Sequence, residues 1–304
     1  MSERIRVGTR GSKLALAQTR EVVEKLEKKG HEVEIKIIKS LGDVLKDKLL
    51  HEFRGSGAFT RALDTALARG EVDVVVHSYK DVPSRRIEGT TIAAVLKRGS
   101  PYDAFVSNSG LGIEEIPAGS IIGTSSLRRR AQILRLRKDL KIENLRGNLD
   151  TRLRKLQQGL YDGIITAEVG LIRLGLDKKV KYQRLPIEKF VPSANQGIIA
   201  VATRVGEEDL VRFMNDKKTE LEAKVERTIL STLGLGCAVP SGILATAKNK
   251  IELICEFLSL NGTKYIRIFE KLNKSTAIED AKEIALNLRD EIFKSGLRTE
   301  LKII

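Results

Sequence analysis

The chain has 304 residues, enough for two or three domains, and a hydrophobic content of 41% excludes disorder over its whole length. Two cysteines exclude a disulfide framework, and with three scattered histidines they offer no spacing for a zinc or other metal site. The net charge of +14 raises nucleic acid as a partner, but the aromatic content is only 4% and no zinc-finger or RNA-binding motif is present, so we expect none.

The first hundred residues alternate short β-branched runs with helical patterns. We predict strands at 5–8, 33–38, 72–76 and 92–96, with a helix that ends at Gly30 and another at 59–69 that Gly70 ends. The run at 72–76 is apolar throughout, which is typical of a strand buried on both faces. Strands that alternate with helices predict a parallel, doubly wound sheet.

A second unit of the same kind begins near Pro101. We predict strands at 121–122, 141–145 and 163–167, a helix at 127–136, and a second helix whose apolar face carries Leu149, Leu153, Leu156 and Leu160. In both units a strand is followed by Gly-Thr and then a helix, at Gly8-Thr9 and at Gly123-Thr124. The sequence therefore predicts two domains of similar topology.

The remaining third of the chain has a different pattern. We predict a strand at 198–202, one long helix at 207–232, a glycine-rich loop that contains Cys237, an antiparallel hairpin across Asn261-Gly262, and a helix at 277–294. We expect an α/β protein with two doubly wound domains and a small α+β C-terminal domain.

Polar side chains follow four of the predicted strands, where ligands of open parallel sheets bind. They are Arg10 and Ser12; His77, Ser78, Lys80 and Asp81; Thr124, Ser125, Ser126, Arg128 and Arg129; and Arg146, Asn148 and Arg152. Hydroxyls and helix N-termini bind anions, and arginine binds carboxylate or phosphate through two hydrogen bonds. Helix caps and solvated arginines explain any single turn equally well. Four such turns favour a ligand with several negative charges.

Asp81 is a carboxylate among cations, suited to act as a general acid or to stabilise a developing positive charge. A turn cap before Pro83 is the alternative interpretation. His77 continues an apolar strand, which is typical of a core histidine.

The two cysteines have different surroundings. Cys255 shares the parity of Ile251, Leu253 and Phe257, which predicts a place in the core. Cys237 lies in a loop with flanking glycines, where a thiol can be a nucleophile or an attachment point, or an incidental loop residue.

Taken together, these segments resemble the porphobilinogen deaminase (hydroxymethylbilane synthase) family. The matching motifs, in the family's order, are GTRGS at 8–12 with LALAQ at 14–18, HSYKDVP at 77–83, DAFVS at 103–107, GTSSLRR at 123–129, LRGN at 145–148 with TRL at 151–153, and GC at 236–237 with VP at 239–240. The resemblance extends from about residue 4 to the end of the chain, and is weak after the cysteine loop.

The resemblance implies a transferase of tetrapyrrole and haem biosynthesis. Four porphobilinogen molecules would condense head to tail, each losing ammonia, to give linear hydroxymethylbilane. The growing chain would be anchored on a dipyrromethane cofactor, held by a thioether to Cys237. Asp81 would be catalytic, stabilising the cationic azafulvene and pyrrolenine intermediates and assisting ammonia release and deprotonation. The family fold has two domains of the periplasmic-binding-protein kind around a cleft and a third that bears the cysteine, with the strand at 198–202 completing the first sheet. The resemblance thus implies the domain boundaries 1–98 with 197–215, 99–196, and 216–304.

The remaining site residues follow from the same resemblance. Those expected to bind the cofactor are Cys237, Lys80, Ser78, Ser126, Arg128, Arg129, Arg146 and Gly147. Those expected to bind substrate are Arg10, Ser12, Arg152 and Arg173.

Two positions depart from the family pattern. The loop before the helix at 59–69 often carries a lysine between glycines, but here it contains Arg54, so Arg54 or Arg61 is expected to supply the charge. A usual glycine is replaced by Asn195, which tolerates a left-handed backbone better than most residues.

A non-catalytic two-domain module that binds anions is the alternative function, and it would need neither Asp81 nor Cys237. The first residues are charged where a signal peptide is apolar, and no apolar run has the length of a membrane span. We expect a cytoplasmic protein with no membrane partner, and the family resemblance implies a monomer.

Overall fold

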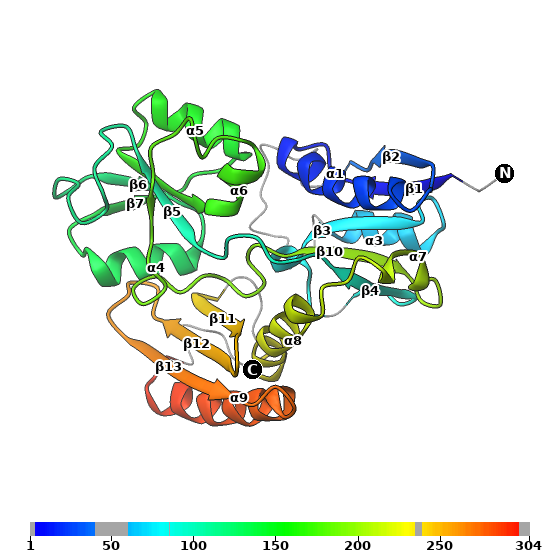
Figure 1. Cartoon of the computed structure of the whole chain (residues 1–304). Helices are drawn as coiled ribbons and strands as arrows, with labels where there is room; N and C mark the ends of the chain where they lie inside the picture. Colours follow the sequence, from blue (N-terminus) through cyan, green and yellow to red (C-terminus); the bar gives the residue numbers. More distant parts are fainter. Residues whose placement is uncertain (1–3, 40–59, 85, 235–238, 298–304) are drawn as a thin grey trace. The chain divides into compact units, whose positions relative to one another are not determined.

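The computed structural model describes residues 4–39, 60–84, 86–234 and 239–297. The chain divides into two compact units (Figure 1). Unit 1 comprises residues 1–99 and 197–221, and unit 2 comprises residues 100–196 and 222–304. Among the described residues, no helix is long and apolar enough to cross a membrane.

Unit 1 contains a five-stranded sheet with the order β2-β1-β3-β10-β4. The strands are β1 (Ile5–Thr9), β2 (Val33–Ile37), β3 (Val74–Ser78), β4 (Thr90–Val95) and β10 (Ile199–Arg204). The helices are α1 (Lys13–Glu27), α3 (Arg61–Ala68), α7 (Asp209–Arg212) and the 3-10 turn η1 (Tyr79–Asp81). Helix α8 (Lys217–Thr232) begins in this unit and continues into unit 2.

Unit 2 contains two sheets. The five-stranded sheet, with the order β7-β6-β8-β5-β9, consists of β5 (Asp103–Ser107), β6 (Ile121–Gly123), β7 (Lys141–Glu143), β8 (Gly163–Ala167) and β9 (Gln183–Arg184). Its helices are α4 (Leu127–Leu136), α5 (Leu149–Gln157) and α6 (Glu168–Arg173). The three-stranded antiparallel sheet, with α9 (Ala277–Lys294), consists of β11 (Ser241–Ala247), β12 (Ile251–Leu258) and β13 (Tyr265–Leu272).

The two five-stranded sheets share one topology, as predicted. In each, a central strand pairs in parallel with its two neighbours, β1 with β2 and β3, and β6 with β7 and β8. The predicted completion of the first sheet by the strand near 198–202 is confirmed, because β10 pairs with β3 and β4. The predicted C-terminal α+β part is also present and consists of β11, β12, β13 and α9.

Each of the predicted parallel sheets also contains one antiparallel strand. Strand β10 runs antiparallel to both of its neighbours, and β5 runs antiparallel to β8 and β9. The register gives the reason for β10: its first residue, Ile199, lies opposite Ser78, the last residue of β3. The chain therefore enters the sheet at the carboxyl end of β3 and can only run back toward its beginning.

The cores lie on both faces of each five-stranded sheet. In β3, Val74 and Val76 pack with Val22 and Leu26 of α1, while Val75 packs in a separate cluster with the leucines of α3. This alternation confirms that the apolar run is a strand buried on both faces, although the strand begins at Val74 rather than at residue 72. The C-terminal sheet buries Cys255, as its parity predicted.

Two helices have other bounds in the structure than the sequence predicts. The helix expected at 207–232 is divided into α7 and α8, because the intervening Asn215 and Asp216 both hydrogen-bond to the backbone of Val95. The Asp216 carboxylate then accepts from the backbone N–H of Thr219 (2.8 Å) in the first turn of α8. The leucine face of α5 stops before Leu160, which is exposed, since Gly159 ends the helix with φ +76°.

Because the core of unit 2 is closely packed, one added methyl group is expected to lower its stability strongly. A Cβ at Gly163 would lie 2.4 Å from Cε2 of Phe105, whose side chain is buried. We expect Gly163→Ala to lower the free energy of unfolding by about 2–3 kcal/mol, measured by urea denaturation. The control is Gly159→Ala, where nothing lies within 4 Å and the left-handed backbone is the only cost, about 1 kcal/mol. An equal loss at the two positions would contradict this account of the packing.

Candidate active site

In unit 1, the carboxyl ends of β1 and β3 lie side by side, because the strands pair in parallel. Arg10 follows β1 directly and is half-buried, and Ser12 caps α1, its Oγ accepting from the N–H of Ala15 (3.2 Å). Ser78 ends β3, and its hydroxyl exchanges hydrogen bonds with the amide of Gln18 on α1 (2.9 and 3.0 Å). The predicted hydroxyls of these two strand ends are therefore brought together, at the N-terminal part of one helix.

Lys80 and Asp81 lie in η1, directly after β3. Tyr79 is buried and its N–H donates to the carbonyl of Ile198 (3.0 Å), which fixes the turn against the start of β10. Asp81 is the last residue of η1, and its side chain is exposed. The turn thus holds its backbone in the sheet while presenting a carboxylate to solvent.

A buried carboxylate holds both flanks of this turn. Asp64 of α3 lies 2.9 Å from Nε2 of His77, which precedes the turn, and accepts a hydrogen bond from Nη2 of Arg86 (2.9 Å), which follows it. Asp64 and His77 are both buried. The interpretation of His77 as a core histidine is confirmed, and its contact with Asp64 ties the end of β3 to α3.

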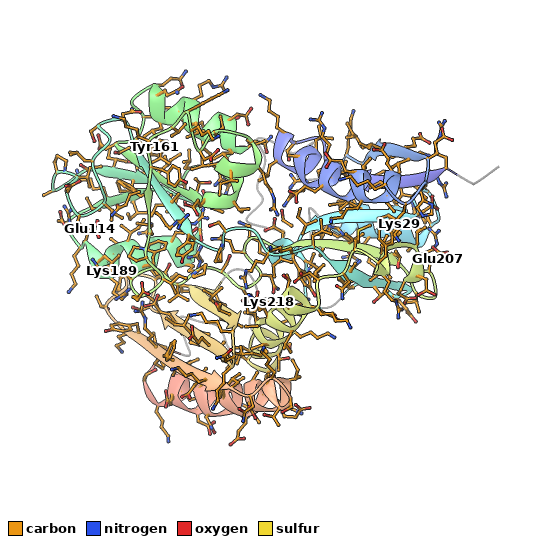
Figure 2. All side chains as sticks on the ribbon, viewed as in Figure 1. Lys29, Glu114, Tyr161, Lys189, Glu207 and Lys218 are labelled. Atoms are coloured by element: carbon orange, nitrogen blue, oxygen red, sulfur yellow. The ribbon has the colours of Figure 1, made fainter. Side chains whose placement is uncertain are left out.

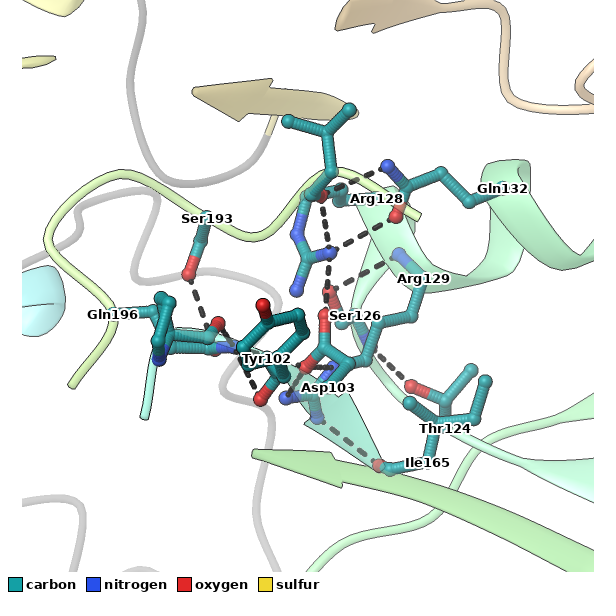
Figure 3. A network of polar contacts seen from close by, with 12 residues as sticks. Tyr102, Asp103, Thr124, Ser126, Arg128, Arg129, Gln132, Ile165, Ser193 and Gln196 are labelled. Carbon is teal, nitrogen blue, oxygen red and sulfur yellow. Dashed lines mark hydrogen bonds and ion pairs between the residues drawn. The ribbon is translucent and has the colours of Figure 1, made fainter. Parts of the chain in front are cut away.

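In unit 2, Ser126 begins α4 as its N-cap, with Oγ accepting from the N–H of Arg129 (3.4 Å). Arg128 and Arg129 follow in the first turn and are only 5% and 6% exposed. The alternative of solvated arginines is therefore wrong for these two residues. Both bind the carboxylate of Asp103, which is fully buried at the start of β5 (Figure 3).

The three charged groups have a defined geometry. Arg128 donates from Nη1 to Oδ2 of Asp103 (2.8 Å), and Arg129 donates from Nε and Nη2 to Oδ1 (3.1 and 2.7 Å). Nη1 of Arg128 also donates to Oε1 of Gln132 and to the carbonyl of Val191, each at 2.9 Å. Nη1 of Arg129 donates to the carbonyl of Ile165 (3.0 Å).

Burial and charge act against each other in this cluster. Burial raises the pKa of Asp103, but the guanidinium groups of Arg128 and Arg129 outweigh it and lower the pKa to about 2. Burial lowers the pKa of Arg128 from its usual value, since Asp103 compensates only in part. One carboxylate thus faces two buried cations, so the N-terminal end of α4 retains positive charge that a further anion would offset.

Other predicted residues of unit 2 lie at the same edge of the sheet, because β6 pairs in parallel with β7 and β8. Arg146 and Gly147 lie in the exposed loop after β7, and Nε of Arg152 on α5 donates to the carbonyl of Gly147 (2.8 Å). Gly147 has φ +113°, and a Cβ there would lie 2.8 Å from Thr151, so only glycine fits. Arg173 ends α6, which follows β8.

Two predicted site residues, Cys237 and Arg54, lie outside the described residues. Arg61, the alternative to Arg54, is the exposed first residue of α3. Burial raises the pKa of the Cys255 thiol far above its usual range, which disfavours its thiolate. Asn195 adopts φ 60°, so the predicted tolerance of asparagine for a left-handed backbone is confirmed.

Three buried partners were not predicted from the sequence: Asp103 as a counter-ion, Gln132 and Asp64. Asp103 belongs to a matching motif, and an acidic residue directly before the apolar run at 104–106 is the signal that a buried partner exists. In contrast to these buried partners, the ion pair of Lys189 and Glu114 (3.4 Å) is exposed (Figure 2). Such exposed pairs contribute little to stability.

Comparison with known proteins gives a consistent family. The family model described as "Porphobilinogen deaminase, dipyromethane cofactor binding domain" matches residues 5–212, and that described as "Porphobilinogen deaminase, C-terminal domain" matches residues 220–294. A probable porphobilinogen deaminase of Archaeoglobus fulgidus is 62% identical over 94% of this chain and 98% of its own. A porphobilinogen deaminase of Syntrophus aciditrophicus is 39% identical over 98% of both chains. Among solved structures, an ancestral cationic amino acid solute binding protein has a TM-score of 0.46 and 16% identity over 70% of this chain and 86% of its own.

The charge balance of the Asp103 cluster predicts a pH dependence of stability. Because the folded-state pKa of about 2 is lower than the usual value of 3.8, Asp103 stabilises the fold above about pH 4 and loses this effect as the pH falls toward 2. We expect Asp103→Asn to lower the unfolding free energy at pH 7 by about 3–5 kcal/mol. The difference in unfolding free energy between the wild type and this variant should decrease by about 2 kcal/mol from pH 4 to pH 2. A difference that stays constant over this range in urea titrations would contradict the role of the ionised Asp103 carboxylate.

Proposed function

The chain belongs to the porphobilinogen deaminase family, and we propose that Asp81, Cys237 and the cationic strand ends perform the family's reaction in it. That reaction is hydroxymethylbilane synthase activity, a group transfer in tetrapyrrole biosynthesis that uses a dipyrromethane cofactor. Four porphobilinogen molecules are joined head to tail, each with loss of ammonia. When bound, the cofactor supplies the pyrrole carbon to which the first substrate unit is joined.

The single observation that carries the assignment of roles is the excess charge at α4. Arg128 and Arg129 are buried and share one carboxylate, so one cationic charge remains for a ligand. Dipyrromethane and porphobilinogen carry acetate and propionate groups, and arginine binds a carboxylate through two parallel hydrogen bonds. The donor set of this chain therefore fits the cofactor.

Each remaining residue receives a role by the same chemistry. We propose that the following side chains and backbone groups hold the cofactor: Ser78, Lys80, Ser126, Arg128, Arg129, Arg146 and Gly147. Cys237 is proposed to form the thioether that anchors it. The carboxylates of the substrate are assigned to Arg10, Ser12, Arg152 and Arg173. The hydroxyls and helix N-termini among these residues supply N–H and O–H donors without a further charge.

Asp81 is proposed as the catalytic residue. Loss of ammonia from porphobilinogen leaves positive charge on its pyrrole ring, and a carboxylate beside that ring stabilises the charge. Formation of the new carbon–carbon bond then requires a proton to leave the attacked pyrrole carbon, and the same carboxylate can accept it. Its place at the end of η1 supports this role, because the side chain is exposed while Asp64 holds the residues on either side.

We also propose that the protein acts as a monomer in the cytoplasm, without a nucleic-acid partner. The domain division is proposed as 1–98 with 197–215, 99–196, and 216–304. Sedimentation of the cofactor-loaded protein tests whether it is a monomer. Limited proteolysis near residues 99, 197 and 216 tests the domain boundaries.

Removal of the Asp81 carboxylate should abolish turnover without unfolding the protein. We expect Asp81→Ala to lower kcat by about a thousandfold or more, since both charge stabilisation and proton transfer are lost. The exposed Asp209, which pairs with Arg212 on α7, gives a matched control, and Asp209→Ala should keep normal kcat. Normal turnover by the Asp81 variant, with an unchanged thermal unfolding curve, would contradict the catalytic assignment.

A further inference from the structure

A second buried carboxylate lies near the α4 arginines but belongs to the C-terminal sheet. Glu256 of β12 is 0% exposed. One oxygen, Oε2, accepts from Nε2 of Gln132 on α4 (2.6 Å), and the other, Oε1, accepts from Nε and Nη2 of Arg267 on β13 (3.1 and 2.7 Å). Arg135 of α4 lies 3.3 Å from the same Oε1. Neither Glu256 nor Gln132 belongs to the motifs to which the proposed function assigns a role.

Gln132 links this carboxylate to Arg128, and its amide has only one orientation that satisfies both. A guanidinium has only donors and a carboxylate only acceptors, so Oε1 of Gln132 faces Arg128 and Nε2 faces Glu256. Nε2 also donates to the carbonyl of Val191 (2.9 Å), which accepts from Nη1 of Arg128 as well. Figure 3 shows the side chain of Gln132 facing that of Arg128, with the hydrogen bond between them drawn as a dashed line.

The backbone of the C-terminal sheet lies directly against these groups. A Cβ at Gly262, in the turn between β12 and β13, would be 2.4 Å from the carbonyl oxygen of Ala131 and 2.6 Å from the amide nitrogen of Arg135. A Cβ at Gly242 of β11 would be 2.6 Å from the carbonyl oxygen of Val191. The sheet, α4 and the Val191 segment are thus held in one register by contacts that leave no room for a side chain.

We propose that Gln132 and Glu256 are positioning residues for Arg128, which fix its guanidinium for a carboxylate of the cofactor and make the C-terminal sheet part of that site. The inference rests on the proposed function of Arg128. The bonds that Arg128 makes to Asp103, Gln132 and Val191 all go through Nη1, so these three acceptors together hold that end of the guanidinium. Removal of Gln132 takes away one of the three.

Glu256 acts through the amide of Gln132. In Glu256→Gln the side chain keeps its shape but brings one acceptor and one donor group to a place where Gln132 and Arg267 both donate. One of the two contacts must then be lost, and in either orientation of the new amide Nε2 of Gln132 no longer has a charged acceptor, so the orientation of Gln132 is held less strongly. A role limited to attaching the sheet to α4 would instead lower stability and leave the affinity of Arg128 for an anion unchanged.

The test measures cofactor loading rather than turnover. Cofactor-free protein, produced in cells that make no porphobilinogen, is mixed with porphobilinogen, and the intact mass is followed with time. We expect Gln132→Met and Glu256→Gln to slow the gain of two pyrrole units by about tenfold, the factor that corresponds to about 1.4 kcal/mol. The double variant should be no slower than Gln132→Met, because both changes break one chain of contacts.

The matched control is Glu252→Gln, on the same strand, which makes the same chemical change at a carboxylate paired with Lys248 (2.7 Å). It should load at the wild-type rate. Wild-type loading by Glu256→Gln, or a double variant slowed by the product of the two single effects, would overturn the inference. If Gln132→Met does not fold, the contrast between Glu256→Gln and Glu252→Gln decides the question alone. A wild-type protein that gains no pyrrole units would overturn the proposed function itself, and this inference with it.

Discussion

One buried carboxylate, Asp103, determines how the second unit presents its positive charge. Two guanidinium groups can be buried at the start of α4 only because this carboxylate binds both, and they lie in the turn where the helix dipole is itself positive. Within the group of Asp103, Arg128 and Arg129, the positive charges exceed the negative charge by one. Preformed geometry with an excess of positive charge suits a carboxylate-bearing ligand, since the protein has little left to reorganise when the ligand binds.

In the first unit the carboxylate of interest, Asp81, is exposed, and buried contacts hold the residues around it. Asp81 ends a single 3-10 turn, which has few internal contacts of its own. The neighbouring residues supply the rigidity: His77 and Arg86 both bind Asp64, and Ser78 binds Gln18 on α1. Both units therefore use a buried acid to fix the residues around a strand end. In the first, the acid holds the turn that bears Asp81, the proposed catalytic residue, and in the second it binds the two arginines that are proposed to bind the cofactor.

The sequence predicts the parts of this arrangement whose cause is local. Hydrophobic periodicity gave α4 and α9 their observed bounds, and the parity of Cys255 placed it in the core, because these patterns depend on neighbours a few residues apart. The direction of β10 and the break between α7 and α8 depend instead on residues far along the chain, Ser78 for the first and Val95 for the second. Arg128 and Arg129 were found as site residues, but their partner Asp103 lies some 25 positions away, and no spacing rule connects them. Glu256 is more distant still, and it looks in the sequence like any polar residue of a half-exposed strand.

The central claim is that this chain builds its product on a dipyrromethane anchored to Cys237. The most direct test is the intact mass of the protein purified from a host that makes porphobilinogen, beside Cys237→Ala and Cys255→Ala. The account predicts an excess equal to two linked pyrrole units in the wild type and in the Cys255 variant, because that thiol is buried, and none in the Cys237 variant. An adduct retained without Cys237, or a wild type that stays unmodified after porphobilinogen is added, would contradict it.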